Sequence, residues 1–72
     1  MRRITSNLAA IRRSKLLSQV DLAIDTGIRS SIISQIERGK RIATEEQAER
    51  IANALHVSPE SIFYESPAES DR

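Results

Sequence analysis

The chain has 72 residues, a formal net charge of +1, no Cys and a single His. A chain of this length forms one small domain, and its composition excludes disulfide bonds, thiolate metal sites and multi-histidine zinc sites. We find no secretory segment and no apolar run long enough to cross a bilayer, so we expect a cytoplasmic protein with no membrane association.

Charge is divided unevenly along the chain. Residues 1–41 hold nine Lys or Arg and three Asp or Glu, a formal charge of +6, whereas residues 42–72 hold two Arg and seven acidic residues, a formal charge of −5. The first part is suited to attract a polyanion that the second part repels. A chance imbalance on a solvated surface would look the same, so charge alone leaves both interpretations open.

The amino-terminal residues predict a first helix over residues 3–14. Ile4, Leu8 and Ile11 recur there at the spacing of one helical face. No segment of the chain alternates apolar and polar residues as a half-buried strand does. We therefore expect an all-α chain.

A second helix begins and ends at clear signals. Ser18 is a favourable N-cap, and Asp21 three residues later completes a weak capping box. Leu22 and Ala23 face inward. Gly27 ends the helix, because glycine tolerates the left-handed backbone of a sharp turn.

A third helix is expected over residues 30–38, with Ile33 and Ile36 in the core, and a basic loop follows it. The small Ala23 permits a steep crossing of this helix with the second one, and Gly27 supplies the turn between them. This arrangement is typical of a helix-turn-helix pair, whose second helix has a free face that can enter a DNA major groove. The alternative is an ordinary helical hairpin that binds nothing.

Two further helices complete the predicted domain. Thr44 and Gln47 form a capping box before an amphipathic fourth helix, and Ser58 and Pro59 open a short fifth helix. His56 stands at the end of the fourth helix and is interpreted as a helix stop, because His tolerates left-handed backbone better than most residues. The sequence thus predicts a five-helix domain over residues 1–64 and an acidic, disordered tail over residues 65–72.

The segment SQVDLAIDTGIRSSIISQIERGKRIATEEQAERIANALHVSPESIF resembles the Cro and phage-repressor type of helix-turn-helix domain. SQVDLA, ISQIERGKR and IANAL followed by VSPESIF are its most specific parts, and the resemblance extends from about Ile4 to Phe63. It implies a compact, lambda-repressor-like fold. It also implies a transcriptional regulator, usually a repressor, that binds an inverted-repeat operator in double-stranded DNA as a homodimer.

The resemblance assigns DNA contacts to individual residues. Ser30, Ser31 and Gln35 face the groove, and Gln35 is expected to bond an adenine edge bidentately. Arg29 stands where the family usually has a capping Ser or Thr, so either it contacts DNA or Ser30 caps the helix in its place. Four residues are expected to contact phosphates: Gln19, Arg38, Lys40 and Arg41.

The resemblance also implies contacts within the protein and between proteins. Arg12 is expected to pair with Glu37, whose charge near a helix C-terminus is opposed by the helix dipole. The dimer interface is expected around the fifth helix, at Pro59, Ser61 and Ile62. Three apolar residues depart from the family pattern and form a candidate surface for a protein partner: Leu16, Val20 and Ile24. The alternative is that Met1 or the tail after Phe63 folds over them within the same chain.

Other classes of function are alternatives to DNA binding. The same fold could serve as a protein-interaction module or as the antitoxin of a toxin–antitoxin pair, although the basic GKR loop favours DNA. An enzyme is not expected, because the sequence has no phosphate-binding glycine loop, no nucleophile–base pair and no metal-ligand set. No cofactor is expected either. Phage repressor, restriction–modification controller and antitoxin all remain open.

Overall fold

The computed structural model of the chain describes residues 3–66, which form five helices and two short strands. In chain order these are β1 (Arg3–Ser6), α1 (Leu8–Ser14), α2 (Gln19–Thr26), α3 (Ser30–Glu37), α4 (Glu45–Leu55), α5 (Pro59–Ile62) and β2 (Phe63–Ser66). The predicted five-helix domain is confirmed, and the two strands are an addition to it. In this part of the chain no helix is both long and apolar enough to span a membrane.

The predicted first helix begins too early. The residues before Leu8 form β1, which pairs antiparallel with β2 and places Ser6 opposite Phe63. The Ser6 hydroxyl accepts a hydrogen bond from the Leu8 amide at 3.1 Å, immediately before the helix. Ser and Asn side chains compete for backbone groups in this way and disfavour a helix interior. The apolar spacing alone was therefore misleading for Ile4.

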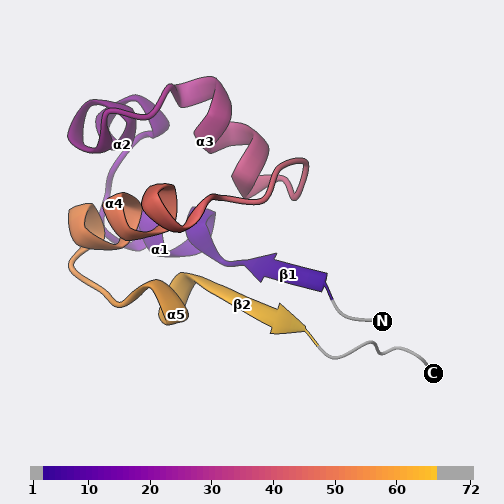
Figure 1. The fold of residues 1–72 in the computed structure, drawn as a ribbon. Coiled ribbons are helices and arrows are strands. Elements are labelled where there is room, and N and C mark those ends of the chain that lie inside the picture. Colours follow the sequence, from indigo (N-terminus) through magenta and orange to yellow (C-terminus); the bar gives the residue numbers. More distant parts are fainter. Residues whose placement is uncertain (1–2, 67–72) are drawn as a thin grey trace.

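The ribbon of β1 and β2 also moves the predicted start of the tail. Glu65 and Ser66 belong to β2, so the expected disordered segment begins two residues too early, and residues 67–72 lie outside the described part of the chain. Figure 1 shows the ribbon extending from the side of the molecule away from α2 and α3. The helix-turn-helix pair and the ribbon thus present separate surfaces.

Capping fixes the ends of the helices. Ser18 and Asp21 form a reciprocal capping box at the start of α2, and Thr44 and Gln47 form another at the start of α4. Gly27 ends α2 with a φ of 74°, in the left-handed region. All three predictions are confirmed. Each capping box satisfies two amide groups that would otherwise lack a partner at the helix N-terminus.

The core lies where α1 to α5 meet, and nine apolar residues are buried in it: Leu8, Leu22, Ile28, Ile33, Ile36, Ile51, Ala52, Leu55 and Ile62. The assignment of Ile62 to a dimer interface is wrong, because its side chain is 0 % exposed within a single chain. Short helices of a small domain need such apolar anchors, since their own hydrogen bonds do not hold them together. Pro59 is half-buried and Ser61 is exposed.

Within residues 3–66, two residues other than glycine adopt left-handed backbone. His56 ends α4 with a φ of 60°, which confirms its interpretation as a helix stop. Leu16, in the loop after α1, has a φ of 61°, and its side chain is 91 % exposed. A branched apolar side chain is disfavoured in this conformation. Leu16 therefore combines backbone strain with exposure of a large apolar group.

Candidate nucleic-acid interface

The turn between α2 and α3 is held by Thr26, a residue to which no role was predicted from the sequence. Thr26 is buried, and its hydroxyl donates to the Leu22 carbonyl at 2.7 Å and accepts from the Ile28 amide at 3.1 Å. These bonds join the last turn of α2 to the segment that enters α3. The position of a single Thr next to Gly27 was the available signal, since hydroxyl side chains commonly bond to nearby backbone in turns.

Helix α3 has one buried face and one polar face. Ile33 and Ile36 are buried on the inner side. The residues about half a turn away from them on the helix are all polar or basic and at least partly exposed: Ser31, Ser34, Gln35 and Arg38. Ser34 was not predicted, although its spacing of three residues from Ser31 places it on the same face. The outer face of α3 is thus free of apolar side chains.

The start of α3 decides between the two expectations for Arg29 and Ser30. Arg29 occupies the N-cap position without a side-chain cap bond, and Ser30 is already the first helical residue. The alternative in which Ser30 caps the helix is therefore wrong. Arg29 is exposed, and its guanidinium has no hydrogen bond within residues 3–66.

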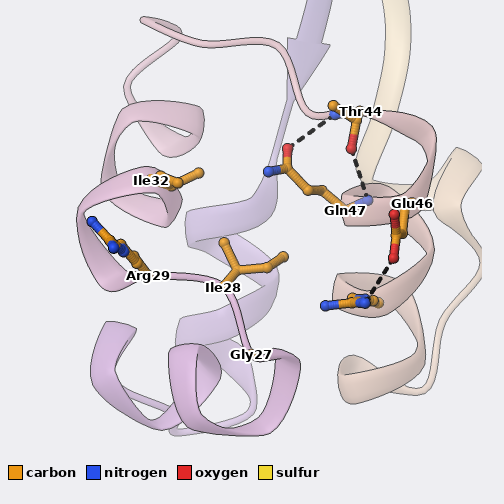
Figure 2. Close-up of a pocket in the computed structure, with 8 residues that line it drawn as sticks. Gly27, Ile28, Arg29, Ile32, Thr44, Glu46 and Gln47 are labelled. Atoms are coloured by element: carbon orange, nitrogen blue, oxygen red, sulfur yellow. Dashed lines mark hydrogen bonds and ion pairs between the residues drawn. The ribbon is translucent and has the colours of Figure 1, made fainter.

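A hollow of about 330 Å³ separates the start of α3 from α4. Figure 2 shows Ile28 pointing across it toward α4, whereas the Arg29 side chain is turned away from Ile28. Across the hollow, Arg50 Nη2 forms an ion pair with Glu46 Oε2 at a distance of 2.7 Å. Of the two arginines that line this hollow, Arg29 is the one that has no acidic partner among residues 6–63.

A buried network connects α1, α2 and α3. The Arg12 Nε donates to Glu37 Oε2 at 2.7 Å, and Arg12 Nη2 donates to Oε1 at 3.2 Å. Gln19 Nε2 donates to the same Oε1 at 2.9 Å, and Arg12 Nη1 donates to the Leu17 carbonyl at 2.7 Å. The expected partners Arg12 and Glu37 are therefore brought together, and Gln19 braces α3 through Glu37.

The hydrogen bonds of this network shift the pKa of both charged partners. The hydrogen bond to Glu37 raises the pKa of Arg12, against the opposing effect of burial. Burial pushes the pKa of Glu37 upward, but the bonds from Arg12 and Gln19 and the charge of Arg12 outweigh it, so the pKa falls below its ordinary value. Both groups stay ionised near neutral pH. The network thus fixes the end of α3 without adding net charge.

The loop after α3 gathers three of the predicted phosphate contacts. Arg38, Lys40 and Arg41 are all exposed, and Gly39 between them has a φ of 75°. The Arg41 Nε donates to the Gln35 Oε1 at 2.8 Å, so the loop turns back onto the outer face of α3. The structure thereby joins a predicted phosphate contact to a predicted base contact.

The apolar stripe predicted as a partner surface is exposed. Val20 and Ile24 are 58 % and 74 % exposed on α2, and Leu16 precedes them in the loop. Val20 and Ile24 line a shallow groove that continues to Arg29 and Ser30. None of the three is part of the core described above.

Comparison with known proteins agrees with this geometry. The family model described as helix-turn-helix matches residues 8–62. The fold is similar to the crystal structure of the restriction-modification controller protein C.AhdI from Aeromonas hydrophila, with a TM-score of 0.70 and 35 % sequence identity over 72 % of this chain and 79 % of that one. No curated protein matches the chain.

Proposed function

This chain belongs to the helix-turn-helix family, and from that premise we propose that it is a sequence-specific DNA-binding transcriptional regulator that acts as a homodimer. The observation that carries the proposal is the outer face of α3, which is polar and is bordered by exposed cations at both ends. Arg29 lies at its start and Arg38 and Lys40 lie at its end. Such a helix presents hydrogen-bonding groups to base edges while its flanking cations attract phosphates.

Rigidity supports the assignment of α3 as the reading helix. Its inner face is anchored by Ile33 and Ile36, and its carboxyl end by Arg12 and Gln19 acting on Glu37. A helix that must place side chains against particular base edges needs a fixed orientation, because hydrogen bonds weaken steeply when their geometry is poor. Gln19 is proposed to contact a phosphate with the amide hydrogen that Glu37 does not use.

The dimer is proposed from the small size of the reading surface. One recognition helix covers only a few base pairs, so useful specificity requires two half-sites about one helical turn apart. A symmetric dimer then binds an inverted repeat. With Ile62 assigned to the core, we propose that Pro59 and Ser61 form the contact surface near α5. Sedimentation with and without operator tests this, and one copy per complete operator would contradict it.

Repression is the proposed outcome of binding, because a regulator whose operator overlaps a promoter blocks polymerase sterically. Among the three candidate classes, similarity to a restriction-modification controller favours control of such a system over a phage repressor or an antitoxin. The basic residues around α3 also favour DNA over a role as a protein-interaction module.

Fluorescence anisotropy with the DNA upstream of the coding region tests the proposal. A shuffled duplex of the same composition serves as the control. We expect tighter binding to the upstream DNA, and binding to both duplexes should weaken steeply with salt as counterions are released. Equal affinity for the two duplexes, or binding that does not respond to salt, would contradict it.

A further inference from the structure

The side chains of Gln35 and Arg41 are joined on the outer face of the reading helix. The Arg41 Nε donates to Gln35 Oε1 at 2.8 Å, and neither side chain makes another hydrogen bond among residues 6–63, whose side chains the structure describes. The Lys40 amide also donates to the Gln35 carbonyl at 2.8 Å, which holds the start of the loop against the end of α3. Arg41 is therefore placed beside Gln35 by the path of the backbone as well as by its own bond.

This contact changes what Gln35 offers to DNA. A free glutamine amide presents one acceptor and two donors, and it matches adenine by using the acceptor for the N6 amino group and a donor for N7. Here the acceptor Oε1 is bonded to a guanidinium. The Gln35 Nε2 and the two terminal nitrogens of Arg41 are donors, and the one remaining lone pair of Oε1 lies beside the cation.

We infer that Gln35 and Arg41 act as one base-reading unit that selects guanine over adenine, an inference that rests on the DNA binding proposed above. Guanine presents two acceptors, N7 and O6, in the major groove, whereas adenine presents one acceptor and one donor. A unit made mainly of donors and carrying a positive charge is complementary to two acceptors. The N6 amino group of adenine would have to share Oε1 with the guanidinium of Arg41 and would approach that cation closely.

The inference differs from both roles that the sequence suggested. Gln35 was expected to read adenine, and Arg41 was expected to clamp a phosphate. Arg41 now becomes a specificity-determining residue. No hydrogen bond joins the side chain of the adjacent Lys40 to Gln35, and Lys40 keeps the role of a phosphate contact. Lys40 is also a matched control, because it is an exposed cation in the same loop.

Selection of binding sites from a pool of random DNA duplexes, followed by sequencing, tests the inference on the full chain. The proteins compared are the wild type, Gln35→Ala, Arg41→Ala, Arg41→Met and Lys40→Ala. Arg41→Met keeps most of the aliphatic stem, so it serves as a second probe if Arg41→Ala folds poorly. The position that Gln35 reads is the one whose preference disappears in Gln35→Ala.

We expect the wild type to prefer guanine at that position by about tenfold or more. Both Arg41 variants should shift the preference to adenine, because Oε1 is then free, whereas Lys40→Ala should weaken binding and keep guanine. A wild-type preference for adenine, or guanine retained in both Arg41 variants, would overturn the inference alone. A wild type that enriches no sequence would overturn the proposed function and this inference with it.

Discussion

Arg12 and Glu37 lie 25 positions apart in the sequence and are joined by two hydrogen bonds in the structure, the shorter of them 2.7 Å long. Arg12 is 7 % exposed, which is unusual for an arginine in so small a domain. Because the pair connects α1 to the end of α3, the orientation of the proposed reading helix depends on it. Stability and DNA binding are therefore expected to be linked through this contact.

Arg12→Ala is predicted to lower the free energy of unfolding by about 3 kcal/mol, because it leaves the carboxylate of Glu37 largely buried without its cation. Arg13→Ala is the matched control. Arg13 is the next residue, also basic but exposed, and its loss should change the free energy of unfolding by less than about 0.5 kcal/mol. Urea unfolding of both variants measures the difference. Equal losses would mean that the pair does not hold the fold.

Stability is predicted to fall in acid partly through Glu37. Its pKa is lowered in the folded chain, so the unfolded chain binds more protons as the pH falls. The stabilisation is complete above the ordinary carboxyl value of about 4.5 and is lost as the pH falls through the lower folded value. The difference in unfolding free energy between wild type and Glu37→Gln should therefore shrink from pH 7 to pH 3. A difference that stays constant would contradict this account.

Leu16→Gly is predicted to stabilise the chain by about 0.5–1 kcal/mol. The left-handed backbone at residue 16 is disfavoured for leucine and open to glycine, which outweighs the extra freedom that glycine gives to the unfolded chain. A change of this size raises the melting temperature of such a domain by several degrees. His56→Gly is a useful comparison, since it shares the conformation. A lower melting temperature for Leu16→Gly would indicate that the leucine packs against something in solution.

Val20→Asp and Ile24→Lys, made separately, are predicted to leave the fold intact. Both side chains are exposed, and the new charges suit the helix dipole, acidic near the start of α2 and basic near its end. Each change should alter the free energy of unfolding by about 0.5 kcal/mol or less, whereas Leu22→Asp in the core should unfold the chain. If the stripe binds a protein partner, both surface variants should lose regulation in a reporter assay while keeping operator affinity. If both variants regulate the reporter as fully as the wild type does, the stripe does not bind a partner that regulation needs.

Much of the fold could be predicted because its signals are local. Helix caps and left-handed positions act within one turn of backbone, so they can be recognised in a single sequence. Examples are the caps Ser18 and Thr44 and the left-handed positions Gly27 and His56. The β1–β2 ribbon was missed because its pairing partners lie at opposite ends of the domain. No local periodicity reports that Ile4 will lie opposite Glu65.

The site was predictable to a similar extent. The residues of the interface could be named from their spacing and from the family resemblance, but their mutual contacts could not. Gln35 and Arg41 were predicted as two separate DNA contacts, but the loop places Arg41 within hydrogen-bond distance of the Gln35 side-chain amide. Likewise Ile62 was predicted to lie at a dimer interface, but the packing of α5 buries its side chain completely. Both outcomes depend on the relative positions of elements.

The most direct test of the central claim is the NMR titration of ¹⁵N-labelled protein with the duplex of highest affinity. We predict that the largest changes in amide chemical shift occur in α3, in the loop at residues 38–41 and at the start of α2. The outer surface of α4, which carries the exposed Glu45, Glu46 and Glu49, and the β1–β2 ribbon should change little. Shifts concentrated in α4 or in the ribbon, with α3 unaffected, would contradict the claim that α3 reads DNA.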